Sequence, residues 1–221
     1  MRLWSDSFTD GGVIAPRCAF AVIDPASQVR LSSNRNPHLA WDDVPAGTES
    51  LALFCIDIDA PSVGTDVNQA GRTVAETLPR TEFFHWSLVD IPPSLKSVPE
   101  GFFSDMVTPH GKPGPLVPFH IKNGTEHQLR HGTNDYTSWF ATDPDMAGEY
   151  FGYDGPCPPW NDLRVHRYLF RLYALDVPQL PIDGSFSGLD ARLAIRGHIL
   201  DEAQILAIYS LHPDVAKTLD E

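Results

Sequence analysis

Two histidines and one aspartate lie in or at the ends of three apolar segments, and these side chains can bind anions or transfer protons. Asp57 ends the run SLALFCID, His85 lies within EFFHWSLVD, and His166 opens HRYLFRLYAL. A carboxylate buried among apolar residues is costly unless hydrogen-bond donors or a histidine satisfy it. We therefore expect Asp57 either to accept backbone and hydroxyl donors, tying down a local turn, or to pair with a histidine.

The segment DGPCPP, residues 154–159, places three prolines around Cys157 shortly before His166. Proline fixes φ and lowers the entropy of the unfolded chain, so this loop is expected to be rigid. A rigid loop beside two imidazoles predicts a pocket. A nucleophilic Cys157 is an alternative, but no activating triad is visible, and we expect a binding protein rather than an enzyme.

Each of these polar residues also has a purely structural interpretation. His85, and His166 together with Tyr168, can be core residues that pack across strands. Asp59 stands before Ala60-Pro61, where an Asx turn is expected. The pocket is favoured because three segments each place a polar group on the inward face next to a proline-containing turn.

The apolar patterning predicts the elements that carry these residues. Nearly continuous apolar runs predict buried strands at 50–57, 82–91 and 166–175, with shorter strands within 12–24 and 37–45. Residues 62–81 and 101–150 are loop-rich. We expect one domain over residues 1–221, mostly β with flanking helices.

Two helices are expected near the C-terminus. Ser187 caps the first, which has Leu189, Leu193 and Ile195 on one side and stops at Gly197. Asp201 caps the second, with Gln204 in the position of a capping box.

The composition excludes several functional classes. The 221 residues carry a formal charge of −13, the wrong sign for nucleic-acid binding or for docking on an anionic membrane. No apolar run approaches the roughly 20 residues of a membrane helix, and the first residues lack a secretory pattern. Three cysteines without CxxC spacing favour reduced thiols, so a cytoplasmic location is expected, and the sequon at 123–125 is interpreted as a turn.

Two metal sites are alternative interpretations. His120, Glu126, His127 and His131 could gather a metal in a metal-dependent β-fold enzyme if their segment folds back as a strand or helix. Asp57, Asp59 and His85 could hold a hard cation, although no second acidic cluster or glycine-rich phosphate loop accompanies them. Exposed loop histidines are the simpler interpretation of the first set.

Six motifs in this order, NPHLAW, LALFCIDIDAP, FFHW, YDGPCPP, HRYLFRLYALD and GHIL, resemble the phosphatidylethanolamine-binding protein (PEBP) family, also called Raf kinase inhibitor protein-like. The likeness covers about Phe8 to Tyr209 and is closest to bacterial members. It implies an antiparallel β-sandwich with a large and a small sheet, and a small pocket for phosphate-type anions. Ile58 replaces a proline that is usual in the family.

The resemblance also implies site residues and partners. Its ligand is a phospholipid headgroup or another phosphorylated group, with no cofactor; a kinase or protease partner and a homodimer are open alternatives. Donation by two histidines predicts stronger phosphate binding near pH 6 than near pH 8. The residues expected to line the pocket or its edge are Asp57, Asp59, Phe83, His85, Gly155, Pro156, Cys157, His166 and Tyr168.

Overall fold

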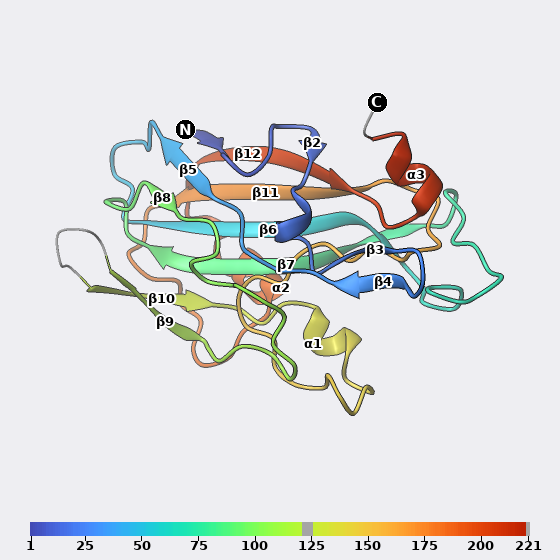
Figure 1. Ribbon diagram of the computed structural model, residues 1–221. Coiled ribbons are helices and arrows are strands. Elements are labelled where there is room, and N and C mark those ends of the chain that lie inside the picture. The colour runs from blue at the N-terminus through green and yellow to red at the C-terminus, as the bar shows by residue number, and fades with distance from the viewer. Residues whose placement is uncertain (121–125, 220–221) are drawn as a thin grey trace.

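A large, mostly antiparallel sheet dominates the computed structural model, which describes residues 1–120 and 126–219 (Figure 1). In these residues the sheet has seven strands in the order β2-β12-β11-β6-β7-β10-β9, and only the pair β12 and β2 is parallel. The turn expected at 123–125 lies outside the described residues. The strands are β2 (Gly12–Val13), β6 (Ser50–Pro61), β7 (Arg80–Ile91), β9 (Leu116–His120), β10 (Glu126–His131), β11 (His166–Leu175) and β12 (Ile199–Tyr209).

Smaller elements cover this sheet. A three-stranded sheet has the order β1-β5-β8, and β3 and β4 form a separate hairpin. The expectation of a mostly β fold with a large sheet, smaller sheets and few helices is therefore confirmed. The remaining elements are β1 (Arg2–Trp4), the 3-10 turn η1 (Pro16–Cys18), β3 (Ala21–Asp24), β4 (Gln28–Leu31), β5 (Leu39–Asp42), β8 (Ser97–Val98), α1 (Tyr136–Trp139), α2 (Gly188–Ala194) and α3 (Pro213–Lys217).

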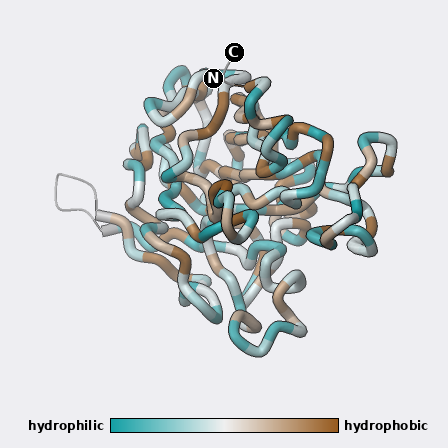
Figure 2. Tube along the Cα trace, turned by 45° about the vertical axis from the view of Figure 1, so that its right-hand side comes forward, coloured by the Kyte–Doolittle hydropathy of each residue, from teal (hydrophilic) through white to brown (hydrophobic). Residues whose placement is uncertain are grey.

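Strand β6 is apolar along most of its length because both faces of the large sheet are covered. Leu53 and Cys55 belong to one hydrophobic cluster with Trp41 of β5, whereas Phe54 belongs to a second cluster with Ala191 of α2. Figure 1 shows β5 in front of the large sheet and α2 behind it, and Figure 2 shows hydrophobic stretches of the trace in the middle of the molecule. Each such fully buried large side chain contributes about 1.5–3 kcal/mol to folding.

The first C-terminal helix is confirmed and the second is wrong. Ser187 accepts a hydrogen bond from the N–H of Asp190 and donates its own N–H to that carboxylate, which forms the capping box of α2. The expected apolar stripe packs only in part: Ile195 is buried together with Ala191, whereas Leu189 and Leu193 are exposed. The segment after Asp201 is strand β12, which pairs with β11 along its length.

Strand periodicity explains this correction. Ile205, Ala207 and Tyr209 are buried while the residues between them are less so. That alternation is the mark of a strand with one buried face. The edge of β11 also leaves a row of unpaired backbone groups unless another strand covers it. Non-local pairing therefore outweighs the local capping signal.

The loop-rich regions are partly regular. Strand β6 runs through Pro61, so the turn expected at Asp59 is wrong; after a register shift, Ala60 pairs with Thr81 of β7. The loop 62–79 follows, and Asn161 holds it by donating its side-chain N–H groups to backbone carbonyls of that loop. Within 101–150, β9, β10 and α1 form. No helix in the described part of the chain is long and apolar enough to cross a membrane.

Candidate functional site

A pocket of about 840 Å³ opens where β6, β7 and β11 meet the β3–β4 hairpin, the loop 62–79 and α1. Asp57, His85 and His166 line it, and each is no more than 3% exposed. We call these three residues the floor. Pockets of roughly 300–1,000 Å³ are typical of small-molecule sites. Phe83, Phe140 and residues 157–159 contribute apolar wall.

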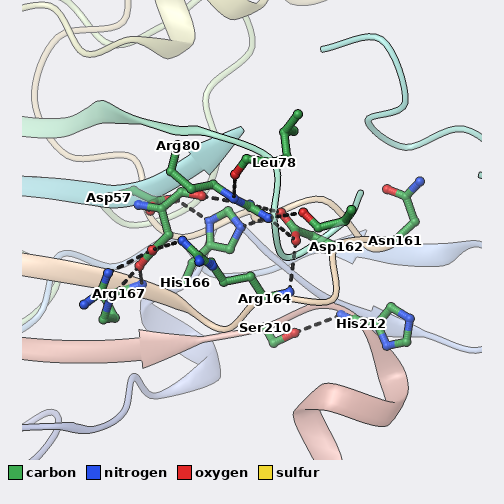
Figure 3. A network of polar contacts seen from close by, with 12 residues as sticks. Asp57, Leu78, Arg80, Asn161, Asp162, Arg164, His166, Arg167, Ser210 and His212 are labelled. Carbon is green, nitrogen blue, oxygen red and sulfur yellow. Dashed lines mark hydrogen bonds and ion pairs between the residues drawn. The ribbon is translucent and has the colours of Figure 1, made fainter. Parts of the chain in front are cut away.

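His166 is held between two carboxylates. Its Nδ1 atom lies 2.6 Å from Oδ2 of Asp57, and its Nε2 atom lies 3.0 Å from Oδ2 of Asp162. Burial opposes the charged ring, but Asp57 and Asp162 outweigh it and raise the pKa of His166 to about 9. The ring is therefore an imidazolium at neutral pH, and both of its N–H groups are committed within the protein (Figure 3).

Three arginines extend this arrangement. Arg80 forms a bidentate contact with Asp162, and Arg167 does the same with Asp59, at 2.7 and 3.0 Å. Arg164 reaches Asp59 at 3.2 Å. Burial alone would raise the pKa of Asp59, but Arg167 brings it below the usual value. We call this set the charge network: His166, Arg80, Arg164 and Arg167 as cations, with Asp57, Asp59 and Asp162 as carboxylates.

His85, in contrast to the charged His166, has a neutral ring. Its Nδ1 donates to the backbone carbonyl of Asp154 at 2.7 Å, and burial lowers the pKa of the ring. The imidazole is therefore neutral, with its proton on Nδ1. Nε2 has no hydrogen-bond partner among the described residues. Since His85 lines the pocket, Nε2 offers the ligand an acceptor.

Asp154 fixes the orientation of His85. Its carboxylate is fully buried and accepts from Asn34 at 2.6 Å, Asn134 at 2.8 Å and Lys112 at 2.7 Å. Three side chains from distant parts of the chain thus hold the residue whose carbonyl selects the tautomer of His85. Asp154 belongs to the YDGPCPP motif, yet the sequence alone gives no sign of its partners.

The residues of the GPCPP loop, 155–159, have two roles: some line the pocket, and the others support the lining residues from behind. The N–H of Gly155 donates to Asn34, and its carbonyl accepts from the hydroxyl of Tyr136. The carbonyl of Pro156 accepts from the N–H of Phe20 at 2.9 Å. Gly155 and Pro156 therefore lie behind the pocket, while Cys157, Pro158 and Pro159 line it.

The structure gathers five of the nine expected site residues into the pocket wall. Asp59 is not at the edge of the pocket, because Arg164 and Arg167 cover it. Tyr168 is fully buried, and its hydroxyl has no partner in the described structure. The five that line the pocket are Asp57, Phe83, His85, Cys157 and His166; their role in binding stays a prediction.

Two parts of the site were missed from the sequence. Asp162 and Arg80 complete the surroundings of His166, and they come from a bend and from the start of β7. The expectation that His166 donates to phosphate is wrong, because Asp57 and Asp162 occupy both ring nitrogens. A carboxylate four residues before His166 is the one signal that pointed to such a pair.

Two of the four candidate ligands of the loop-histidine metal site, His127 and His131, are not brought together, and the side chains of the other two, His120 and Glu126, lie outside the described residues. His127 and His131 lie on β10, and four strand positions separate them by about 13 Å. His131 is buried, accepts from Trp86 Nε1, and its pKa is lowered to about 3 by burial. Asp57 and Asp59 are occupied by His166 and Arg167. No group of three metal-ligating side chains forms within the described residues.

Cys157 is expected to react slowly with alkylating reagents. Burial raises the pKa of its thiol to about 12, and the thiolate is the reactive form. Burial also raises the pKa of Cys18 to about 12 and that of Cys55 well above its usual value. Labelling of the native protein by iodoacetamide at pH 7.5 should be at least about 100-fold slower than that of a free thiol.

The same protein unfolded in urea is the control, and there all three cysteines should label at the ordinary rate. Rapid labelling of native Cys157, identified by peptide mapping, would contradict this expectation and restore the nucleophile as an alternative.

The chain is similar in sequence to a known protein family and to individual members of the UPF0098 group. The sequence profile of the family described as phosphatidylethanolamine-binding protein matches residues 4–210. The chain is 29% identical to the UPF0098 protein YbhB of Escherichia coli over 95% of its length and 100% of that protein. It is 30% identical to a UPF0098 protein of Methanothermobacter thermautotrophicus, over 95% and 98% of the two chains.

A solved structure is also similar. The crystal structure of Escherichia coli YbcL, described as a new member of the mammalian PEBP family, matches with a TM-score of 0.63 and 23% identity. The match covers 95% of this chain and 97% of that one. At this identity the likeness establishes a shared fold.

Proposed function

This chain belongs to the phosphatidylethanolamine-binding protein family, and on that premise we propose that it binds a small phosphate-bearing ligand in the pocket above Asp57, His85 and His166. The ligand is a phospholipid headgroup or another phosphorylated small molecule. Its phosphate lies at the floor, and its remaining atoms contact the apolar wall. The proposal describes binding without a chemical step.

The observation that carries this proposal is the sign of the charge behind the floor. The whole chain has a formal charge of −13, so an anion needs a local source of positive potential. The charge network supplies four cationic side chains against three carboxylates. His166 and Arg80 are buried, so their charges act on the pocket with little screening, whereas Arg164 and Arg167 are 38% and 50% exposed and contribute less.

His85 determines which form of phosphate fits. Nε2 of its neutral ring accepts a proton and has none to give. A phosphate monoester that carries one proton can donate it to Nε2, whereas the fully ionised dianion would place its oxygen against the nitrogen lone pair. The second pKa of a phosphate monoester is about 6. The floor therefore selects the monoanion.

A pH-dependent affinity follows for phosphate monoesters. Methyl phosphate should bind more tightly at pH 6 than at pH 8, by up to about 50-fold, because its monoanion falls from about half to about one per cent of the total. Calorimetric titration at the two pH values measures this. The direction matches the expectation from sequence, but the titrating group is the ligand, since His166 stays charged and His85 stays neutral.

Dimethyl phosphate separates these explanations. It has one negative charge at both pH values and no proton to donate, so its weaker affinity should not change between pH 6 and pH 8. An equal pH dependence for the two ligands would assign the titration to the protein and contradict the role given to His85. Failure of methyl phosphate to bind at pH 6 would contradict the proposed function itself.

Regulation of a kinase or protease is left out of this proposal. The small ligand alone is supported by the pocket and by the charge of the network.

A further inference from the structure

Lys112 does not line the pocket, yet it forms an ion pair with the residue that orients His85. Its Nζ atom lies 2.7 Å from Oδ1 of Asp154, and the two side chains are 15% and 0% exposed. The backbone carbonyl of the same aspartate accepts from Nδ1 of His85 at 2.7 Å. Asp154 therefore connects a largely buried cation to the imidazole that faces the ligand.

The backbone beside Lys112 is fixed by a close contact between two loops. Gly111 has a φ of +85°, and a Cβ atom there would lie 2.0 Å from the backbone carbonyl oxygen of Glu149. A Cβ atom at Gly148 would lie 2.2 Å from the carbonyl oxygen of His110. Only glycines allow two backbones to approach so closely. The ammonium group of Lys112 is therefore preorganised for its partner.

His85 lies between two carboxylates, and each carboxylate has a cation of its own. Asp57 is paired with the imidazolium of His166, and Asp154 is paired with Lys112. Both carboxylates raise the pKa of His85, but burial outweighs them and lowers it. The neutral ring thus depends on both cations, because removal of either one leaves a buried carboxylate whose charge attracts a proton.

Tyrosines are the other titratable side chains whose rings contact His85. The ring centroids of Tyr136 and Tyr168 lie 5.5 and 5.2 Å from that of His85, and burial raises the pKa of both hydroxyls, so they stay uncharged. Lys112 also acts on His131, but burial is the larger effect there and lowers the pKa to about 3, so that ring stays neutral. The remaining titratable residues of the pocket wall are Arg30, Glu82, Asp135 and Cys157.

We propose that Lys112 determines which form of phosphate the pocket accepts, by neutralising Asp154 and so keeping Nε2 of His85 an acceptor. This inference rests on the proposed function and adds a specificity-determining residue outside the pocket. The amides of Asn34 and Asn134 donate to Asp154 and favour its ionised form. Without the ammonium group, the carboxylate therefore draws a proton to His85, and Nε2 becomes a donor that fits the phosphate dianion.

Ring-nitrogen NMR of the histidines in ligand-free protein tests the charge of His85 at pH 6. In wild-type protein the two ring nitrogens should resonate far apart, as in a neutral imidazole with its proton on Nδ1. In Lys112→Met they should converge to the values of an imidazolium. Lys112→Arg keeps the charge and should keep the wild-type pattern. Lys217→Met is the matched control, since Lys217 also pairs with an aspartate, but at the surface; it should change nothing.

Calorimetric titration with methyl phosphate tests the specificity. In wild-type protein the affinity should fall by up to about 50-fold from pH 6 to pH 8. In Lys112→Met the fall should be less than about fivefold, because a charged His85 binds the dianion that predominates at pH 8. Adding Asp154→Asn to Lys112→Met removes the carboxylate charge as well, and should return both the neutral ring and the wild-type pH dependence.

A ring of His85 that stays neutral in Lys112→Met, or a pH dependence that survives there, would overturn the role of Lys112. An imidazolium that persists after Asp154→Asn is added would do the same. If Lys112→Met does not fold, Lys112→Gln decides by the same two measurements, because its amide can donate to Asp154 without a charge. If methyl phosphate does not bind wild-type protein at pH 6, the proposed function fails instead, and the NMR result still decides whether Lys112 keeps His85 neutral.

Discussion

Raising the pH from 6.5 to 8.5 is expected to lower the free energy of unfolding by about 2–3 kcal/mol, because of His166 alone. The pKa of this ring is raised to about 9 in the folded protein and lies near 6.5 in an unfolded chain. Below pH 6.5 both states hold the proton, and the stabilisation is fully present. As the pH rises towards 9 the unfolded state loses the proton first, so the stabilisation is progressively lost.

Urea denaturation at closely spaced pH values measures this dependence. His166→Ala should remove most of the slope, and at pH 6.5 it should cost about 3–5 kcal/mol because Asp57 is left buried without its cation and Asp162 keeps only Arg80. His198→Ala is the matched control: His198 also pairs with a carboxylate, Asp176, but at the surface. It should change stability by less than about 1 kcal/mol.

The upper limit of pH 8.5 matters because of the cysteines. Burial raises the pKa of Cys18, Cys55 and Cys157, so as the pH approaches and passes 8.5 their ionisation in the unfolded chain adds a growing decrease of the same sign. A flat wild-type profile between pH 6.5 and 8.5, or an unchanged slope in His166→Ala, would contradict the charge assigned to His166. If His166→Ala does not fold, Asp162→Asn should reduce the slope while retaining the packing.

The strands were predictable from local pattern because burial on both faces leaves a continuous apolar run. Expected and observed bounds coincide for β11, and β6 and β7 extend beyond theirs. The local sequence after Asp201 does not distinguish a strand from a helix, because a helix-capping signal and an alternating strand pattern overlap there. The free edge of β11 decides it, and that edge exists only once the sheet has formed.

Within the site, too, some contacts could be predicted from local sequence and others could not. Both alternatives for Asp57 are met, because its Oδ2 contacts Nδ1 of His166 while its Oδ1 accepts from the backbone N–H of Asp59. The partner on the other side of His166 could not be foreseen, because Asp162 approaches only through the bend of the chain. Arg80 is separated from Asp162 by 82 positions. Such contacts are determined by the path of the loops, which hydrophobic periodicity does not specify.

Gly155, which supports the pocket wall from behind, packs closely against η1, and this contact can be tested by substitution. A Cβ atom at this position would lie 2.1 Å from the backbone carbonyl oxygen of Cys18 and 3.0 Å from the hydroxyl of Tyr153. Backbone atoms of η1 cannot rotate away as a side chain does. Gly155→Ala is therefore expected to lower the free energy of unfolding by about 3 kcal/mol, the upper part of the range for overpacked sites.

Gly64→Ala is the control, because Gly64 also lines the pocket and its Cβ would meet nothing within 4 Å. This variant should be near neutral in urea denaturation and should bind methyl phosphate like wild-type protein. Gly155→Ala should also weaken methyl phosphate binding, since separating the loop from η1 breaks the bond between Phe20 and Pro156 and displaces Cys157. Wild-type stability in Gly155→Ala would mean that the loop yields freely, and the prolines would then not hold the pocket wall rigid.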